Sequence, residues 1–351
     1  MSDAITIALD AMGGDYAPEI VIKGALIARG RFPNLRYLIF GDERLIQPLL
    51  NKYSGLVDIS TIVHTTQVVR GEDKPSVALR NSRESSMRLA IEAVSTGKAS
   101  AMVSAGNTGA LMAMSKIVLR TLPGIDRPAM ASYFPTMKGE SVMLDLGANV
   151  QYDTANLLQF ALMGSVFATA VLGIRKPIVG LLNVGSEEVK GNEIVRETHA
   201  ILKNIKLPGH YHGFIEGDDI AKGTVDVIVT DGFTGNIVLK SIEGTAKLIS
   251  EFLKQTFRSS FLAQIGYLFA RPALNTLKVR VDPRRYNGAI FLGLNGVAVK
   301  SHGSTDAIGF ANAIGVAANM VIHHAIDKIK HDYELIKDSM KPLSVHPAVP
   351  S

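Results

Sequence analysis

Two segments of the chain place glycines, amides and hydroxyls directly after short apolar runs. Residues 104–109 (Ser-Ala-Gly-Asn-Thr-Gly) follow the run 99–103, and residues 231–236 (Asp-Gly-Phe-Thr-Gly-Asn) follow the run 225–229. A strand, a glycine turn and a helix in this order leave backbone N–H groups free to bind a phosphate, because glycine permits the tight turn and the helix N-terminus attracts an anion. One such turn can equally serve only as a connection, but its recurrence along the chain favours a phosphate site.

Charged side chains near such turns are the catalytic candidates: Asp145, Asp231, Lys190 and Lys240. Phosphate is already a nucleophile at neutral pH, so an enzyme that uses it needs to position it and to stabilise a developing oxyanion. Lysines and backbone N–H groups suit that task, and either carboxylate suits the orientation of a phosphate proton. For each carboxylate, a purely structural role as a helix cap or in an ion pair remains an alternative. The residues predicted to bind substrate or phosphate are Ser104, Gly106, Asn107, Thr108, Gly109, Asn149, Asn192, Gly235 and Asn236.

Capping is an alternative role for Asn107 and Asn236, because an amide that precedes a helix often serves only as its N-cap. Lys240 follows Asn236 by four residues, so both face the same side of the first helical turns. The helix dipole opposes a lysine near a helix start, and a bound phosphate would compensate for this.

Several familiar sites are absent from the sequence. It has no G-x-x-x-x-G-K-[ST] loop, no G-x-G-x-x-G after the first strand and no G-x-S-x-G elbow. The absence of cysteine excludes disulfides, thiolate metal sites and a cysteine nucleophile. We interpret His323 and His324 as ordinary residues of one helix, because adjacent positions do not share a face. We therefore predict no metal and no cofactor.

Apolar runs that alternate with helical segments predict an α/β fold with a mostly parallel, doubly wound sheet. Strands are expected at 5–10, 36–40, 59–64, 141–146 and 178–182, besides the runs named above, and again at 289–292 and 298–300. Long helices are expected from about 75 to 94 and from 305 to about 331. Ligands bind beyond the carboxyl ends of such strands, so we expect one edge to gather the turns at Gly13, Gly106, Gly147, Gly185 and Gly232.

We predict a single α/β domain over residues 1–335, with a helical insertion at about 245–276 and a loose tail at 336–351. Within the insertion, apolar residues recur at helical spacing on either side of Ser259-Ser260, which predicts a pair of short amphipathic helices. Between residues 247 and 285 the local net charge is +6, against +5 for the whole chain. Such faces suit an anionic membrane surface or a dimer partner, and both remain open.

Two basic clusters could receive an acidic partner: Arg80, Arg83 and Arg88, and Arg280, Arg284 and Arg285. Contacts of this kind mainly speed encounter and respond to salt. A solvated basic face is the alternative for each cluster.

Five motifs in order resemble the bacterial phosphate acyltransferases of phospholipid synthesis (acyl-ACP:phosphate acyltransferases). The likeness runs from about residue 5 to about residue 327, and a segment at 231–240 is also similar to the phosphotransacetylases. The motifs are Leu-Asp-Ala-Met-Gly-Gly-Asp (9–15), Ser-Ala-Gly-Asn-Thr-Gly-Ala (104–110), Leu-Asp-Leu-Gly-Ala-Asn (144–149), Asn-Val-Gly-Ser-Glu (183–187) and Asp-Gly-Phe-Thr-Gly-Asn (231–236).

This resemblance implies transfer of a long fatty acyl group from the thioester of acyl carrier protein to inorganic phosphate, which gives acyl phosphate. It also implies a fold like that of the phosphotransacetylases and isocitrate-type dehydrogenases. We further expect a homodimer that lies in the cytoplasm and is peripherally attached to the inner face of the membrane. We expect no nucleic-acid partner.

The residues themselves leave two other functions possible. The first is a metal-dependent dehydrogenase on the same fold, with Asp145 and Asp231 as Mg²⁺ ligands. The second is a membrane-surface scaffold or acyl-carrier docking module without catalysis. A scaffold has no need of five turns rich in glycine, asparagine and aspartate, so the sequence favours an enzyme.

Overall fold

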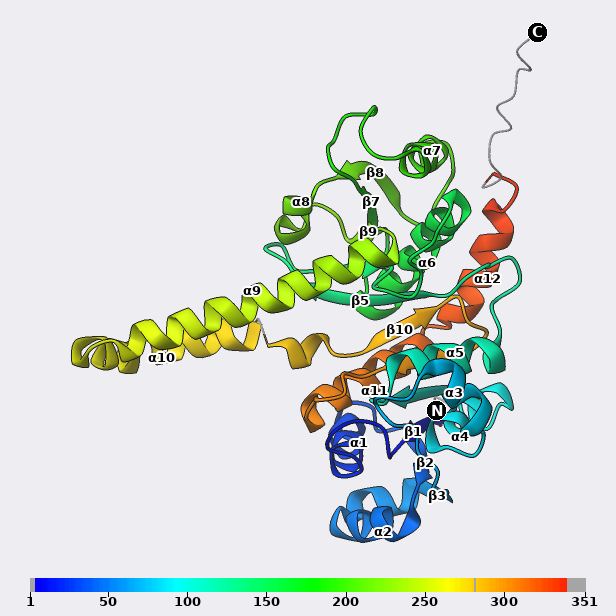
Figure 1. The fold of residues 1–351 in the computed structure, drawn as a ribbon, viewed down its shortest axis with the longest axis vertical. Coiled ribbons are helices and arrows are strands. Elements are labelled where there is room, and N and C mark those ends of the chain that lie inside the picture. The colour runs from blue at the N-terminus through cyan, green and yellow to red at the C-terminus, as the bar shows by residue number, and fades with distance from the viewer. Residues whose placement is uncertain (1–3, 281, 340–351) are drawn as a thin grey trace.

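The computed structural model describes residues 4–280 and 282–339 and contains one eleven-stranded sheet, in the order β3-β2-β1-β4-β11-β10-β5-β6-β9-β7-β8 (Figure 1). Seven of the neighbouring pairs are parallel, which confirms the predicted fold class. The strands are β1 (Ile5–Asp10), β2 (Leu35–Gly41), β3 (Ser60–His64), β4 (Ala101–Ser104), β5 (Ala129–Pro135), β6 (Glu140–Leu144), β7 (Ile178–Leu182), β8 (His210–Ile215), β9 (Val227–Val229), β10 (Ala289–Leu292) and β11 (Val297–Lys300).

Helices cover both faces of this sheet. The α-helices are α1 (Glu19–Arg31), α2 (Glu43–Lys52), α3 (Pro75–Asn81), α4 (Ser86–Ser95), α5 (Thr108–Leu119), α6 (Thr154–Leu172), α7 (Glu193–Leu202), α8 (Gly217–Lys222), α9 (Gly232–Arg258), α10 (Phe261–Arg280), α11 (Ala307–Ile322) and α12 (Ala325–Ile336). Two 3₁₀ turns, η1 (Ser54–Ile59) and η2 (Pro283–Tyr286), complete the described elements.

Strand direction reverses in the middle of the sheet. β10 pairs antiparallel with both β11 and β5, and β5 pairs antiparallel with β6. The parallel strands β1, β4 and β11 therefore run opposite to β6, β9 and β7. The glycine turns that follow these strands form two groups, and the prediction of a single edge is wrong because the antiparallel strands reverse the direction.

The core lies between the sheet and its longest apolar helices. All four residues of β4 are buried, and Phe160 and Phe167 of α6 are fully buried. In the described chain, α6 is the one helix long and apolar enough to cross a membrane, but 78% of its most apolar window is buried within the protein. We therefore interpret it as a core helix, stabilised by removal of its apolar surface from water.

Two predicted helices are each split in the structure. The first becomes α3 and α4, because the Ser85 side chain caps α4 by accepting from Arg88 N and donates to Ser82 O. The second becomes α11 and α12, with His324 between them at a φ of +50°. His323 and His324 thus lie at a junction rather than inside one helix. β5 and β8, which the sequence analysis missed, lack uninterrupted apolar character, and β8 is an edge strand of the sheet.

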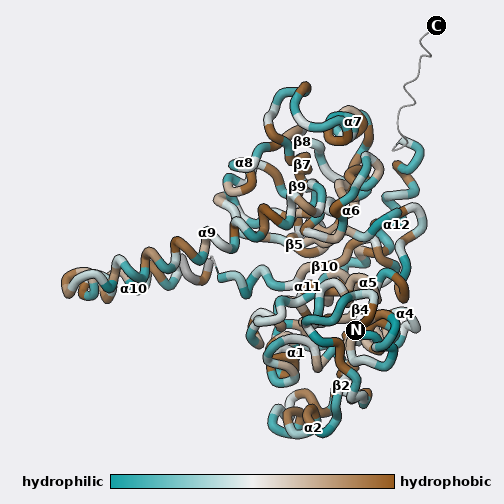
Figure 2. The backbone as a smooth tube through the Cα atoms, in the orientation of Figure 1, coloured by the Kyte–Doolittle hydropathy of each residue, from teal (hydrophilic) through white to brown (hydrophobic). Residues whose placement is uncertain are grey.

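The predicted amphipathic pair is confirmed as a protruding arm made of α9 and α10 (Figure 1). α9 begins at Gly232, so residues 245–276 are the outer part of two longer helices, and the break falls at Ser259-Ser260 as predicted. The Phe257 and Tyr267 rings meet edge to face at 5.4 Å and hold the helices together near the tip. Figure 2 shows hydrophobic segments along this arm, and apolar side chains such as Leu248 and Phe252 are exposed there.

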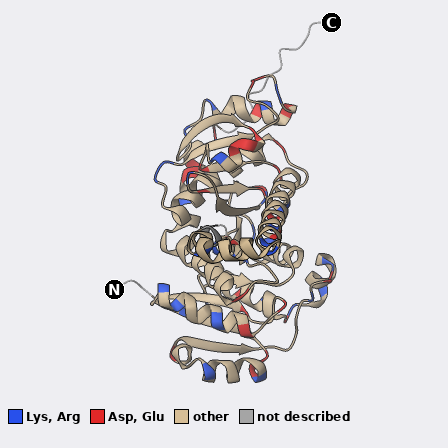
Figure 3. Ribbon diagram, turned by 90° about the vertical axis from the view of Figure 1, so that its left-hand side faces the viewer, with Lys and Arg blue, Asp and Glu red and all other residues tan. Residues whose placement is uncertain are grey.

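The C-terminal helix α12 ends at Ile336, which is buried. Most of the predicted loose tail, residues 340–351, lies outside the described residues. On the face that Figure 3 presents, Lys and Arg are spread over several elements rather than gathered in one stripe. The positive net charge therefore does not mark a site by itself.

Candidate functional site

The first group of turns surrounds the carboxyl ends of β1, β4 and β11, which are neighbours in the sheet. Ser104, the last residue of β4, donates its hydroxyl to Asp10 Oδ2 at 2.6 Å, and Gly106 N donates to Ser104 Oγ at 3.0 Å. Asp10 and Ser104 are both fully buried. Burial raises the pKa of Asp10, and hydrogen bonds led by that from Ser104 oppose the rise.

The turns after β1 and β4 lie directly against each other. A Cβ atom on Gly13 would lie 2.5 Å from Asp10 Oδ2 and 2.7 Å from Gly106 N. Only glycine permits this approach, so Gly13 brings the two turns together. The motif at 9–15 therefore shapes the same site as the motif at 104–110.

Lys300 ends β11 in this group, and sequence reasoning missed it. Only 9% of the residue is exposed, and Nζ donates to Ala105 O at 3.3 Å and to Ser301 O. Burial lowers the pKa of Lys300 to about 8, although the charges of Asp10 and Asp15 act in the opposite direction. A lysine that ends the apolar run Val-Ala-Val, directly before Ser-His-Gly, was the available signal.

Asn107 of the predicted phosphate turn is already engaged within the protein. Its Oδ1 accepts from Ala110 N at 3.0 Å, which caps α5, and its Nδ2 donates to Gly71 O and Asp73 O at 2.8 and 2.9 Å. Thr108 is exposed, and Gly109 packs against Pro75, whose Cγ would lie 2.7 Å from an added Cβ. Asn107 thus joins the loop at 70–75 to this turn.

Asp145 is the centre of the second group, at the end of β6. Its Oδ1 accepts from Met130, Gly147 and Ala148 N, and its Oδ2 accepts from Asn149 N and Nδ2, at 2.7 to 3.3 Å. The carboxyl is fully buried, and burial raises its pKa against these bonds. Asp145 therefore organises the turn at 145–149, and no face of it is open to a substrate or metal in this structure.

Asp231 and the start of α9 close over that turn. Asp231 caps α9, because its Oδ1 accepts from Phe233 N and Thr234 N at 3.0 Å and its Oδ2 accepts from the Thr234 hydroxyl at 2.6 Å. An added Cβ on Gly235 would lie 1.9 Å from Asp145 O, so this glycine allows the two turns to touch. Asn236 is exposed beside Gly147, and no hydrogen bond to a described residue engages its amide.

Asn149 is buried and donates to Pro128 O at 2.8 Å besides its bond to Asp145. Asn192 caps α7 and donates to Tyr152 OH at 3.0 Å, which links the loop after β7 to the loop after β6. Lys190 in that loop is exposed and forms no ion pair with any described residue. The second group thus offers Lys190 and Asn236 to a ligand, while its carboxylates are occupied.

Helix α9 connects the two groups. Lys240 pairs with Glu243 at 2.8 Å, and both side chains lie close enough to His302 to influence it. Burial, followed by the charge of Lys300, lowers the pKa of His302, while Lys240 and Lys247 add to the effect and Glu243 opposes it. Lys240 therefore faces the Lys300 side of the molecule. Among the described residues, no group of three or more His, Cys, Asp or Glu residues could hold a metal.

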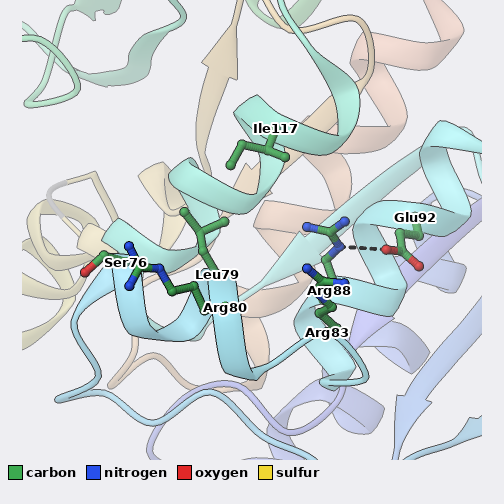
Figure 4. A pocket seen from close by; sticks show the side chains of 7 residues that line it. All are labelled: Ser76, Leu79, Arg80, Arg83, Arg88, Glu92 and Ile117. Carbon is green, nitrogen blue, oxygen red and sulfur yellow. Dashed lines mark hydrogen bonds and ion pairs between the residues drawn. The ribbon is translucent and has the colours of Figure 1, made fainter.

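A cavity of about 570 Å³ lies between α3, α4 and α5 (Figure 4). Arg80, Arg83 and Arg88 line it, and only Arg88 has an ion-pair partner among the described residues, Glu92 at 2.6 Å. Arg284 of the other basic cluster is engaged by Asp282 and Asp306 at 2.5 and 2.9 Å. The side chain of Arg280 lies outside the described residues. Arg80 and Arg83 of the first cluster and Arg285 of the second form no ion pair with a described residue.

Comparison with known proteins assigns the family. The profile of a family described as fatty acid synthesis protein matches residues 5–328. The phosphate acyltransferase of Rhodospirillum centenum is 60% identical over 99% of this chain and 98% of that relative. The chain belongs to the phosphate acyltransferase family. The phosphate acyltransferase of Paramagnetospirillum magneticum, at 59% identity over the same shares, agrees.

Membership of the phosphate acyltransferases makes the chain an enzyme that transfers acyl groups, and the family description connects it with fatty acid synthesis. Solved structures support the fold. A phosphotransacetylase from Streptococcus pyogenes has a TM-score of 0.60 at 18% identity and covers 91% of this chain and 94% of its own. The EutD phosphotransacetylase from Staphylococcus aureus has a TM-score of 0.58 at 17% identity over 90% and 94%. The predicted likeness to the phosphotransacetylase fold is thus confirmed.

Proposed function

We propose that this phosphate acyltransferase moves a long-chain fatty acyl group from the thioester of acyl carrier protein to inorganic phosphate, giving acyl phosphate for phospholipid synthesis. The observation that supports this most directly is the first group of turns, where the glycine turn at 104–109 lies against the buried ammonium group of Lys300, which donates to Ala105 O. Such a site suits an anion, and phosphate needs no activated serine or cysteine to attack a thioester.

The reaction balances without a cofactor. A phosphate oxygen attacks the thioester carbonyl, the tetrahedral oxyanion collapses, the C–S bond breaks and the new C–O–P bond remains. The proton from phosphate leaves with the thiol. The protein has to hold both reactants in line and stabilise the oxyanion, for which Lys190 and the unengaged amide of Asn236 are the available groups of the second set of turns.

The test is to incubate the full chain with palmitoyl acyl carrier protein and ³²P-labelled phosphate, and to trap acyl phosphate with hydroxylamine. We expect label in the lipid phase and hydroxamate that exceeds a phosphate-free control. Loss of thioester at the same rate with and without phosphate would contradict the proposal and favour the scaffold function. Dependence of activity on NAD(P) and Mg²⁺ instead would favour the dehydrogenase.

For the docking of the carrier we favour the cavity lined by Arg80, Arg83 and Arg88. One carboxylate, that of Glu92, lines this cavity with the three arginines and pairs with Arg88 alone, whereas Arg284 is committed to two carboxylates. Charge reversal at Arg80 and Arg83 should lower kcat/KM for acyl carrier protein by about tenfold or more and leave a small acyl thioester unaffected. Equal loss of kcat/KM on both substrates would exclude this docking role. The double variant Lys52→Glu with Lys203→Glu changes the net charge by the same amount and is the matched control.

We further propose that the α9–α10 arm attaches a homodimer to the inner face of the cell membrane. Apolar side chains of α10 are well exposed, including Leu268 at 63% and Phe269 at 84%. Ile265→Glu with Leu268→Glu should abolish flotation with anionic liposomes and leave an active dimer, because an interfacial helix needs its apolar face. Leu45→Glu with Val57→Glu, at other exposed apolar positions, is the control. Dissociation into monomers would show that the arm is a subunit interface.

A further inference from the structure

Lys300 is a buried cation without a carboxylate partner. Among residues 4–280 and 282–339 no Asp or Glu lies within ion-pair distance of its Nζ, which donates only to the carbonyl oxygens of Ala105 and Ser301. An ammonium that is removed from water without a carboxylate in direct contact is costly, and the charges of Asp10 and Asp15 offset this cost only in part, since the pKa of Lys300 is still lowered. A bound anion in direct contact would reduce the remaining cost.

The turn beside Lys300 also carries a buried carboxyl group, that of Asp10. Ser86, at the start of α4, is 1% exposed and lies close enough to Asp10 to lower the pKa of that carboxyl, although its hydroxyl makes no hydrogen bond of normal geometry to a described residue. Lys300 itself contacts the carbonyl of Ala105, inside the glycine turn that the sequence marks as a phosphate site. A cation and this turn therefore meet at the ends of β4 and β11, next to the buried Asp10 at the end of β1.

The other candidate lysines are less suited to bind phosphate. Lys190 is exposed, and Lys240 is exposed and paired with Glu243. Water screens a charge at such positions, whereas attraction to an anion is several times stronger in a partly buried site. Burial thus separates Lys300 from the lysines that the sequence alone singled out.

We propose that Lys300 binds the attacking phosphate, holding it with its ammonium group against the turn at residues 104–109. The inference rests on the proposed phosphate-dependent activity and assigns a catalytic residue within it. Lys300 keeps phosphate at the edge of β11 while the acyl thioester approaches from the side of α9.

The pH dependence follows from the charges around Lys300. Asp10 and Asp15 favour its charged form, burial disfavours it, and His302 lies on its α9 side together with Lys240, Lys247 and Glu243. With a pKa of about 8, Lys300 is charged at pH 7 and loses its proton as the pH rises. Because kcat/KM reports the free enzyme, kcat/KM for phosphate should fall above about pH 8.

Lys300→Met and Lys300→Arg test the proposal. Methionine removes the charge but retains an unbranched side chain, so the apparent KM for phosphate should rise by about 10- to 100-fold, the usual size of a lost charge-assisted hydrogen bond. The KM for the acyl donor should change little. Lys203→Met, which removes an exposed lysine paired with Glu188 at 2.6 Å, is the matched control and should behave as wild type.

Two further measurements keep the test decisive. Phosphate alone should raise the Tm of wild type and of Lys203→Met but not of Lys300→Met, because a ligand stabilises only the state that binds it. In Lys300→Arg, the decline of kcat/KM for phosphate above about pH 8 should disappear, since arginine keeps its charge. This profile also decides the matter if Lys300→Met does not fold.

A wild-type phosphate KM and Tm shift in folded Lys300→Met, or an unchanged pH profile in Lys300→Arg, would overturn the proposal and leave Lys300 a structural residue. Either result would leave the phosphate-dependent activity of the wild type intact. Conversely, failure of the wild type to make acyl phosphate would refute the proposed function itself. The two failures are therefore distinguishable.

Discussion

The two groups of turns use the same residue types for different work. Around β1, β4 and β11, the buried ammonium of Lys300 contacts two carbonyl oxygens and no carboxylate. Around β6 and β9, Asp145 and Asp231 use both carboxylate oxygens on neighbouring donors. The comparison teaches that a motif marks a turn, whereas the number of unoccupied polar atoms decides whether the turn can bind a ligand.

The largest expected effect concerns the contact that closes the second group. Gly235→Ala places a Cβ 1.9 Å from Asp145 O, so backbone has to move, and we expect a loss of about 3 kcal/mol or more in the free energy of unfolding. Gly244→Ala is the control in the same helix, because no atom lies within 4 Å of its added Cβ. It should be neutral or stabilise by up to about 1 kcal/mol. Urea denaturation measures both, and equal stabilities would mean that the two turns do not touch.

Asp145→Asn tests whether this carboxylate is structural or catalytic. An amide cannot accept from all five donors, and each buried donor left unsatisfied costs about 1–3 kcal/mol, so we expect a loss of about 3 kcal/mol. Asp231→Asn should cost less than about 1 kcal/mol, since asparagine caps helices as well as aspartate. If Asp145→Asn keeps its stability in urea but loses turnover, the catalytic role predicted from sequence is correct and the comparison fails.

Asn107→Ala and Asn236→Ala should give the smallest change in stability and the clearest division of roles. Loss of the α5 cap at Asn107 should cost about 1 kcal/mol. Asn236→Ala should leave unfolding unchanged and should raise the phosphate requirement or lower turnover, because its exposed amide makes no hydrogen bond to a described residue. Thermal unfolding and kinetics at limiting phosphate measure the two effects. Normal kinetics in both variants would place the phosphate site elsewhere, away from these amides.

The sequence alone determined the local elements and the family. Apolar runs between glycine turns predicted most strands, since burial on both faces leaves a continuous apolar signature. Apolar spacing on either side of Ser259-Ser260 predicted the two helices of the arm and the break between them. Composition excluded cysteine chemistry outright. These features depend on neighbouring residues along the chain, which is why sequence reasoning reached them.

Only the tertiary structure decided which turns meet and which side chains remain available. The reversal of direction at β10 and β5 divides the turns into two groups, and strand direction is set by non-local pairing. The burial of Lys300 likewise depends on β4 and the turn after it, which lie far from it in sequence. Four of the five donors to Asp145, in contrast, come from its own turn, and only Met130 comes from β5. Residue type and spacing cannot report how deeply distant segments will bury a side chain, and burial is what distinguishes Lys300 from the exposed lysines.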